Sequence, residues 1–463
     1  MARLVIVSNR TAAPRDRNAR AGGLAVALRE ALQRRGGVWF GWSGDVSDAP
    51  SDQAKVQDVG NIRFATMDLL PDDHDAFYNQ FANGTLWPLC HYRLGLFEFR
   101  RVGFEGYLRV NRLFAERLAP LLRPDDIIWV HDYHFFSLGA ELRDLGVRNP
   151  IGFFLHIPFP APEVLTVLPR HRRLLSNICA YDLVGLQTDL DVLAFRNMLV
   201  REVGGTVDDD GRFHAFGQRG TVAAFPVGID TDGFARLAEA GVGGLDASRL
   251  RDSLAGRKMV IGVDRLDYSK GLPQRLEAFE MMLQTHEQHR RKVTFMQIAP
   301  ISRGEVEQYR TLRRDLEGRV GHINGRFAEF DWAPVRYLNK AFPRQTLAGF
   351  YRAAAVGLVT PLRDGMNLVA KEYVAAQNGD DPGVLVLSRF AGAARELPQA
   401  LIVNPFDVEE VADAIDQALV MPQHERQARW SEMMVALRAR TSRRWCDDFL
   451  DRLGAVAATR GAA

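Results

Sequence analysis

Cysteine is scarce in this chain of 463 residues, and Cys90, Cys179 and Cys446 lie far apart. No two of them have the CxxC spacing, so the sequence supports neither a zinc knuckle nor a disulfide framework. Few and unpaired cysteines are typical of proteins in reducing compartments. The sequence therefore predicts a cytoplasmic protein.

Long hydrophobic runs are also missing. No stretch approaches the ~18 consecutive apolar residues of a membrane-spanning helix. The apolar run at residues 4–8 is too short for the core of a signal peptide and is typical of a buried strand. We expect no membrane partner and no signal peptide.

Neither sign of charge is in excess. Lys and Arg total 59 and Asp and Glu total 57, a formal net charge of +2. This balance gives no indication of a nucleic-acid partner, so cations in this protein are expected to act locally. Hydrophobic residues make up 47%, an ordinary globular content, and a chain of this length is expected to form two domains.

Short apolar runs recur along the whole chain with amphipathic stretches between them. Five lie in the first half (4–8, 127–130, 151–156, 183–187 and 222–227) and five in the second (259–263, 293–298, 356–360, 384–387 and 401–403). Runs that are apolar throughout indicate strands covered on both faces. The pattern predicts an α/β fold with two Rossmann-like, doubly wound domains that face each other across a cleft.

The domain boundary is expected after the segment 226–230, where a polar helical stretch separates the two sets of strands. We predict an N-terminal domain over 1–230 and a C-terminal domain over 231–445. A last helix is expected over about 423–454, and the helix and tail at 446–463 either stand alone or return to the first domain.

The segment 360–372 is typical of a strand, a glycine turn and a helix start, with Asp364 at the turn and Glu372 inside the helix. A helix start presents free backbone N–H groups, which suit phosphate or sugar hydroxyls. About ninety residues earlier, Arg265 and Lys270 follow another strand. A planar guanidinium and a flexible ammonium together indicate a site for a nucleotide diphosphate.

Other polar groups also follow expected strands. Gly22 and Gly23 open a helix, where they either cradle a phosphate or form a plain turn, and no GxGxxG fingerprint is present. Arg303 follows the run 293–298. Asp189-Leu190-Asp191 matches a metal-binding DxD pattern by letters, but its place at a helix start favours capping.

Histidines follow two strands of the first half. His131-Asp132-Tyr133-His134 suits hydroxyl binding or proton transfer, whereas Asp132 as a helix cap is the alternative. No third ligand accompanies the two imidazoles, so we expect no metal. His156 is either a buried, satisfied histidine or a site residue whose direction is fixed by the prolines after it. Tyr78 and Trp87 are either a sugar platform or core.

Taken together, these segments resemble the trehalose-6-phosphate synthases, which are retaining glycosyltransferases with the two-domain GT-B fold. The resemblance runs over nearly the whole chain, and its signature blocks are Phe40-Gly41-Trp42-Ser43-Gly44, Trp129-Val130-His131-Asp132-Tyr133-His134, Phe154-Leu155-His156-Ile157-Pro158-Phe159-Pro160, Arg265-Leu266-Asp267-Tyr268-Ser269-Lys270-Gly271 and Arg363-Asp364-Gly365-Met366-Asn367. It implies transfer of glucose from a nucleotide-glucose, usually UDP-glucose, to glucose 6-phosphate, without a metal or other cofactor. The choice among UDP, GDP and ADP stays open.

The resemblance also implies the roles of individual residues. The acceptor would be held by Arg10, Tyr78, Trp87, Asp132 and Arg303. The donor would be held by Gly22, Gly23, Arg265, Lys270, Phe342 at the base, Gly365, Met366, Asn367, Leu368, Val369, Ala370, Lys371 and Glu372 at the ribose. The catalytic set would be His156, Arg265, Lys270 and Asp364, with the first and last of these on the donor glucose.

The family further implies a homodimer or a homotetramer and a product, α,α-trehalose 6-phosphate, that a separate phosphatase would process. Two alternatives stay open. A related enzyme could couple cyclitols through nitrogen, and a non-catalytic sensor could bind sugar phosphates on the same fold. Product formation from UDP-glucose and glucose 6-phosphate separates the three.

Overall fold

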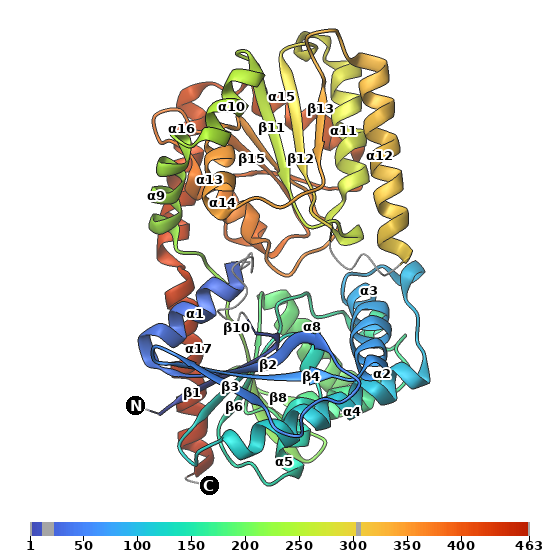
Figure 1. Cartoon of the computed structure of the whole chain (residues 1–463), viewed down its shortest axis with the longest axis vertical. Coiled ribbons are helices and arrows are strands. Elements are labelled where there is room, and N and C mark those ends of the chain that lie inside the picture. The colour runs from blue at the N-terminus through green and yellow to red at the C-terminus, as the bar shows by residue number, and fades with distance from the viewer. Residues whose placement is uncertain (1, 12–22, 302–306, 462–463) are drawn as a thin grey trace. The chain divides into compact units, whose positions relative to one another are not determined.

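The computed structural model describes residues 2–11, 23–301 and 307–461, which form two compact units (Figure 1). Unit 1 comprises Met1–Pro226 and Arg443–Ala463, and unit 2 comprises Val227–Ser442. The chain therefore leaves unit 1 once and returns to it near its C-terminal end.

Unit 2 contains a six-stranded parallel sheet. Its strands are, in spatial order, β13 (Val335–Leu338), β12 (Val293–Ile298), β11 (Lys258–Val263), β14 (Val356–Val359), β15 (Val384–Ser388) and β16 (Leu401–Val403). The chain order is reversed between β11 and β14, which are hydrogen-bonded neighbours. Such a switch point leaves a crevice at the carboxyl ends of the two strands, where ligands of doubly wound sheets bind.

Helices cover both faces of this sheet (Figure 1). One layer contains α9 (Thr231–Val242), α10 (Leu245–Leu254), α13 (Arg344–Ala353), α14 (Leu368–Ala376) and α16 (Gln423–Ala439), and the other contains α11 (Leu272–Thr285), α12 (Glu307–Phe327) and α15 (Val408–Val420). Helices on both faces bury every side chain of β12 and β14 and all but the first residue of β11, which is why these strands are mostly apolar.

Unit 1 contains a ten-stranded sheet among its described residues. The order is β3 (Lys55–Val59), β4 (Ile62–Leu69), β2 (Gly37–Val46), β1 (Leu4–Arg10), β5 (Ile127–His131), β6 (Ile151–Phe154), β7 (Leu183–Leu186), β10 (Gln218–Ala224), β9 (Arg212–Ala215) and β8 (Thr206–Val207). The pairs from β4 to β10 are parallel, and only β3, β9 and β8 at the margins pair antiparallel.

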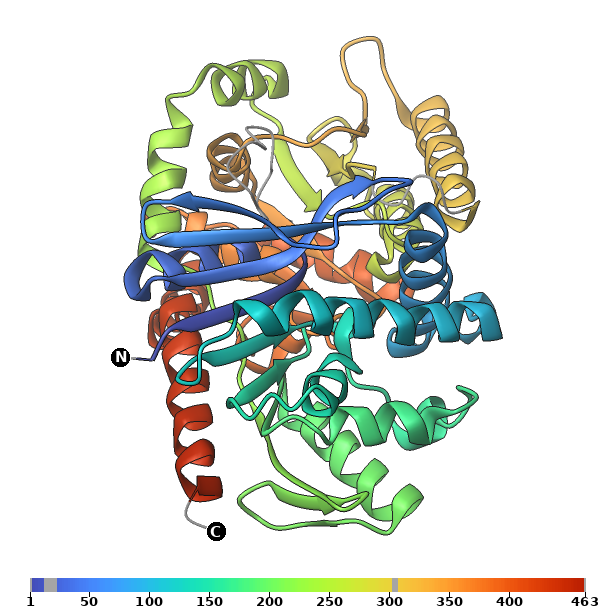
Figure 2. The same cartoon turned by 60° about the horizontal axis from the view of Figure 1, so that its bottom comes forward.

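Helices α1 (Gly23–Arg35) and α17 (Ser442–Gly461) lie side by side on one face of this sheet (Figure 2), and α4 (Arg101–Leu118) and α5 (Leu138–Asp144) cover the other. The remaining helices are α2 (Pro71–His74), the π-helix η1 (Asp75–Leu86), α3 (Trp87–Cys90), α6 (Pro162–Leu165), α7 (His171–Ile178) and α8 (Asp189–Val203), with short 3-10 turns at η2 (Leu94–Leu96), η3 (Ala119–Leu121) and η4 (Tyr133–Phe135). Unit 2 has three such turns, η5 (Tyr268–Lys270), η6 (Glu287–His289) and η7 (Gly392–Arg395).

The C-terminal helix α17 is part of the core of unit 1. Its Phe449 is fully buried and stacks on Trp129 of β5 with ring centroids 4.7 Å apart. A Cβ atom at Gly152 or Gly185 would approach the Phe449 ring within 2.7 and 2.6 Å, respectively. Glycine on β6 and β7 therefore makes the room into which this ring packs.

The predicted fold class is confirmed, and all ten apolar runs are strands. The predicted single last helix is wrong, because α16 ends before Arg440 and α17 begins at Ser442. Arg440 leaves helical geometry at φ −128° and ψ 66°, and Thr441 pairs instead with Ile229 in an isolated parallel bridge. Within the described residues, no helix is long and apolar enough to cross a membrane.

Candidate active site

The switch point of unit 2 brings together two side chains that are 94 positions apart. Lys270 lies at the end of η5 after β11, and Asp364 lies after β14. Lys270 Nζ is 2.5 Å from Asp364 Oδ2, and the two side chains are 11% and 13% exposed. Asn367 Nδ2 donates to the same carboxylate oxygen at 3.0 Å. The pairing places an ammonium group at the carboxyl ends of the central strands.

Asn367 begins helix α14 in a left-handed conformation, with φ 77°. Asparagine tolerates this conformation better than most residues with a side chain. Its Oδ1 accepts from the Ala370 N–H at 3.2 Å. The N–H groups of Leu368 and Val369 belong to the same first turn, which has no intrahelical acceptors. This turn combines open N–H groups with the positive end of the helix dipole, an arrangement that suits a phosphate.

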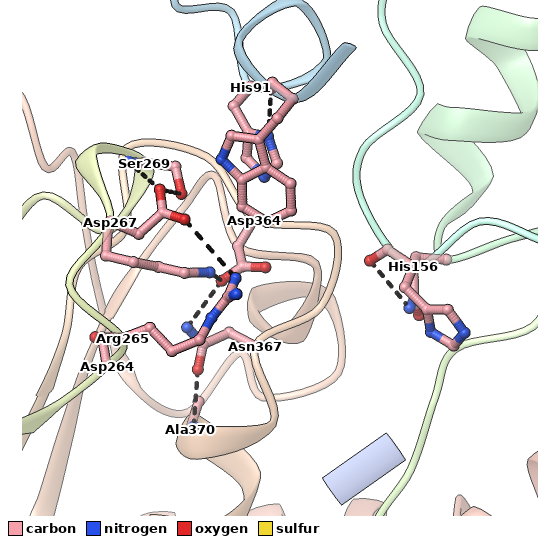
Figure 3. A network of polar contacts seen from close by, with 12 residues as sticks. His91, His156, Asp264, Arg265, Asp267, Ser269, Asp364, Asn367 and Ala370 are labelled. Atoms are coloured by element: carbon pink, nitrogen blue, oxygen red, sulfur yellow. Dashed lines mark hydrogen bonds and ion pairs between the residues drawn. The ribbon is translucent and has the colours of Figure 1, made fainter. Parts of the chain in front are cut away.

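Arg265 and Asp267 form the other side of the β11 loop, and Figure 3 shows them gathered with Asp364 and Asn367. Asp267 is fully buried, and its Oδ1 accepts from Ser269 N at 2.9 Å, which caps η5. Arg265 Nη2 lies 3.7 Å from Asp267 Oδ2, with its side chain 47% exposed. The buried carboxylate therefore orients a guanidinium that is still accessible to an anion.

A buried arginine that the sequence analysis missed supports this loop from below. Arg275 of α11 is fully buried, and its Nη2 donates to Asp264 Oδ2 at 2.9 Å and to the Lys270 carbonyl at 3.2 Å. Burial raises the pKa of Asp264, and the Arg275 charge opposes that rise. No sequence signal marks Arg275, because its position in an amphipathic helix is that of an ordinary solvated arginine.

Further along α14, neighbouring residues have different environments. Burial raises the pKa of Glu372 to about 7, and the Arg344 guanidinium, 3.7 Å away, acts in the opposite direction. The Lys371 side chain is fully buried, and its Nζ donates to the Val227 carbonyl at 2.7 Å and to Glu396 at 2.9 Å. Lys371 therefore anchors α14 within unit 2, and only its backbone is left to meet a donor.

The predicted base residue Phe342 lies in the loop between β13 and α13. It packs edge-on against Phe350 with ring centroids 5.3 Å apart, and Lys340 Nζ lies 4.9 Å from its ring centre. Gly365 and Met366 belong to the turn before α14, where the Met366 carbonyl accepts from Ala393 N at 2.8 Å. This hydrogen bond fixes the turn against η7.

In unit 1, the histidines of the two motifs meet at the ends of adjacent strands. His131 ends β5, His156 follows β6, and His131 Nδ1 lies 3.1 Å from His156 Nε2. Burial lowers the pKa of His156 to about 3 and that of His131 well below its ordinary value. Both imidazoles are therefore neutral at physiological pH.

Asp132 connects the same two loops. Its Oδ1 accepts from the His156 backbone N–H at 3.3 Å. Asp132 occupies the N-cap position of η4, as the capping alternative predicted, but its side chain makes no cap bond there. Asp132 has φ 78° and ψ 168°, a region populated almost only by glycine. Backbone strain of about 1–3 kcal/mol at a carboxylate is typical of functional sites rather than of plain turns.

The DxD pattern has a structural role. Thr188 and Asp191 form a capping box at the start of α8, as the alternative interpretation predicted. Asp191 Oδ1 also accepts from Phe159 N at 3.0 Å, which fixes the loop that follows His156. Among the described residues, no three His, Cys, Asp or Glu side chains come together to hold a metal.

One of the two aromatic residues of the predicted acceptor set lies on unusual backbone. Tyr78 belongs to the π-helix η1, a rare element that often marks functional sites. Its ring is stacked between His74 and His134, with centroids 5.3 and 5.8 Å away. Trp87, in α3, is buried against Tyr133 with ring centroids 5.5 Å apart. Trp87 is therefore mainly core, whereas Tyr78 is only partly buried.

Arg10 leaves β1 at its carboxyl end and passes over Gly44 of β2. A Cβ atom at Gly44 would be 2.6 Å from the Arg10 guanidinium, and Gly44 has φ +96°. Glycine suits the positive φ here, and a methyl group at this position would displace the end of the flexible Arg10 side chain. Gly23 begins α1, whereas Gly22 and Arg303 lie outside the described residues.

Residues 3–455 match the family model described as glycosyltransferase family 20. The chain belongs to glycosyltransferase family 20. A trehalose-6-phosphate synthase of Sinorhizobium fredii is 51% identical over 98% of this chain and 99% of its own length. An α,α-trehalose-phosphate synthase (UDP-forming) of Burkholderia vietnamiensis has a TM-score of 0.97 and 52% identity, with 99% of this chain and 98% of that chain covered.

A third similar protein is a UDP-forming α,α-trehalose-phosphate synthase of Burkholderia xenovorans, solved in complex with glucose-6-phosphate. It has a TM-score of 0.94 and 51% identity, with 98% of this chain and 100% of that chain covered. The predicted resemblance is thereby confirmed for this family 20 glycosyltransferase over nearly the whole chain.

Proposed function

We propose that this family 20 glycosyltransferase transfers glucose from UDP-glucose to glucose 6-phosphate and releases UDP and α,α-trehalose 6-phosphate. The observation that carries the proposal is the full-length similarity to a UDP-forming synthase that binds glucose-6-phosphate. A trehalose phosphate contains two glucose units and one phosphate. One glucose and the phosphate come from the acceptor, so the other glucose comes from the donor that yields UDP.

In this proposal unit 2 binds the donor. Lys270 and Arg265 neutralise the diphosphate together with the N–H groups of Leu368 and Val369, while Glu372 accepts from the ribose hydroxyls. Asp364 orients the Lys270 ammonium at 2.5 Å and bonds a glucose hydroxyl. Because two cations and a helix start already face the leaving group, the reaction needs no metal.

Unit 1 binds the acceptor. Arg10 pairs with the phosphate of glucose 6-phosphate, and Asp132 and Tyr78 position the sugar. The bond from the donor anomeric carbon to the diphosphate oxygen breaks, and a bond to the acceptor anomeric oxygen forms on the same face. The acceptor hydroxyl proton passes to the departing diphosphate oxygen, so the configuration is retained without a protein nucleophile.

The test is an assay of the full chain with UDP-, GDP- or ADP-glucose and glucose 6-phosphate, in buffer containing EDTA. We expect glucose 6-phosphate-dependent release of UDP and a product whose two anomeric carbons are both α by NMR. Release of another nucleoside diphosphate alone would overturn the choice of nucleotide. Saturable binding of UDP-glucose without any transfer would identify a sensor instead.

We further propose a cytoplasmic location and a homodimeric or homotetrameric assembly. The sparse and buried cysteines support the first. Sedimentation of the purified chain at two concentrations tests the second, and a monomer at both would refute it.

A further inference from the structure

Two imidazoles in unit 1, those of His131 and His156, are in direct contact, although only one of them is accessible to a ligand. His131 and His156 stack with ring centroids 5.3 Å apart and an interplanar angle of 26°. His156 is partly exposed, whereas His131 is 1% exposed and cannot itself meet a substrate. Whatever His131 does for the reaction, it does through His156.

The contact between them requires a defined proton position. Each neutral imidazole carries one N–H and one bare nitrogen, so in the 3.1 Å contact between His131 Nδ1 and His156 Nε2 one ring donates and the other accepts. Two arrangements satisfy this rule. Both leave Nδ1 of His156 available to a ligand, as an N–H donor when His131 donates and as a bare acceptor when His156 donates.

The surroundings of His131 distinguish the two arrangements. Its Nε2 is buried and has no hydrogen-bond partner among the described residues, and the same holds for the indole N–H groups of Trp129 and Trp445. Both indoles pack on it, with ring centroids 4.5 and 6.3 Å away. A proton on His131 Nε2 would place a third unpartnered donor among two others. Each buried donor without an acceptor costs about 1–3 kcal/mol, and orphaned N–H groups are rarer than orphaned acceptors.

We propose that His131 is a positioning residue that donates its Nδ1–H to His156 Nε2 and so holds the His156 proton on Nδ1. Its own Nε2 is then a bare acceptor, buried next to the two indole rings. His156 presents a fixed N–H donor instead of a mixture of tautomers. This inference rests on the proposed function and, for the partner of that N–H, on the contact with a donor-glucose hydroxyl that the family resemblance implies for His156.

The tautomer is read directly from the full chain labelled with ¹⁵N-histidine, without substrate. His156→Ala assigns its resonances among the 11 histidines. In the wild type we expect a protonated Nδ1 and a bare Nε2 on His156. In His131→Leu the proton should move to Nε2 or divide between the two nitrogens. A bare Nδ1 on His156 in the wild type would overturn the proposal.

Turnover tests the consequence. An asparagine amide can place its nitrogen where His131 Nδ1 lies, so His131→Asn should keep the wild-type tautomer and most of the turnover. His131→Leu should lower kcat about tenfold or more, the effect of about 1.5 kcal/mol from one lost hydrogen bond. The KM for glucose 6-phosphate should stay unchanged. His131→Leu with wild-type tautomer and wild-type kcat would also overturn the proposal.

Controls separate this result from misfolding and from failure of the proposed function. His289 of unit 2 is also buried, at 7% exposure, and bonds Asp416 at 2.7 Å, so His289→Leu reports the general cost of losing a buried histidine. Melting temperatures identify variants that lose turnover by unfolding. If the wild type transfers no glucose, the proposed function fails while the tautomer measurement still decides the role of His131.

Discussion

Replacing Lys270 should separate its part in catalysis from its part in folding. Lys270→Met removes the ammonium group that faces the leaving diphosphate. At a separation of 4 Å and an effective dielectric constant of 20, one unit of developing charge interacts with that ammonium by about 4 kcal/mol. Turnover should therefore fall by about a thousandfold. The KM for glucose 6-phosphate, which binds unit 1, should change little.

The same substitution has a structural cost. It leaves the Asp364 carboxylate, which is 13% exposed, without its lysine. One-sided loss of a buried pair costs about 3–5 kcal/mol, and partial solvent screening reduces this to about 2 kcal/mol. The melting temperature of unit 2 should fall by about 4–8 °C.

The double variant Lys270→Met/Asp364→Asn distinguishes the two effects because it leaves no unpaired charge. It should recover most of the melting temperature and none of the turnover in a coupled assay of UDP release. Lys55→Met is the control for loss of a lysine–carboxylate pair at the surface, since Lys55 lies 2.6 Å from Asp68 on the edge of unit 1 and is 61% exposed. Recovery of turnover to within tenfold of the wild type in the double variant would refute the assigned role of Lys270.

Three further predictions follow from the geometry. Gly44→Ala should displace the Arg10 guanidinium and raise the KM for glucose 6-phosphate about tenfold to a hundredfold, which is the effect of one charged hydrogen bond. The control is Gly60→Ala, which is also at positive φ but has open space around it and should leave this KM unchanged. The pKa of Glu372 is raised from 4.5 to about 7, so its contribution to folding stability should fall as pH rises from 4.5 to 7 and stay level above 7. In denaturant titrations, Glu372→Gln should remove that fall. Since the ionised carboxylate is the form that accepts from the ribose hydroxyls, the KM of the wild type for the donor should be higher at pH 6 than at pH 8. Phe449→Ala should destabilise unit 1 by about 3–5 kcal/mol in urea unfolding, and a cost below 1 kcal/mol, as expected for the exposed Phe330→Ala, would contradict the core role of α17.

Most of the strands that the sequence analysis missed lie towards the margins of a sheet. β3 is exposed along its whole length, and β13 forms the edge of its sheet with three half-buried residues. β2 is central, but its glycines and polar end interrupt the apolar run. Apolar patterns report burial on two faces, so edge strands and glycine-rich strands carry a weaker signal.

The part of the candidate site that the sequence predicted consists of residues that directly follow central strands. Lys270 and Asp364 were expected in one site because each follows an apolar strand, and the structure places these two strands at the switch point. The buried supports were not predictable in the same way. Arg275, Lys371 and the contact between His131 and His156 depend on which side chains the fold turns inward, and the residue letters do not carry that information.

The return of the chain to unit 1 has a consequence for biosynthesis. Unit 2 is continuous, whereas the core of unit 1 lacks Trp445 and Phe449 until the whole of unit 2 has been translated. Domains usually fold in the order in which they leave the ribosome. In this protein the second unit to be started is the first that can be completed, and the N-terminal sheet must wait with one face only partly covered.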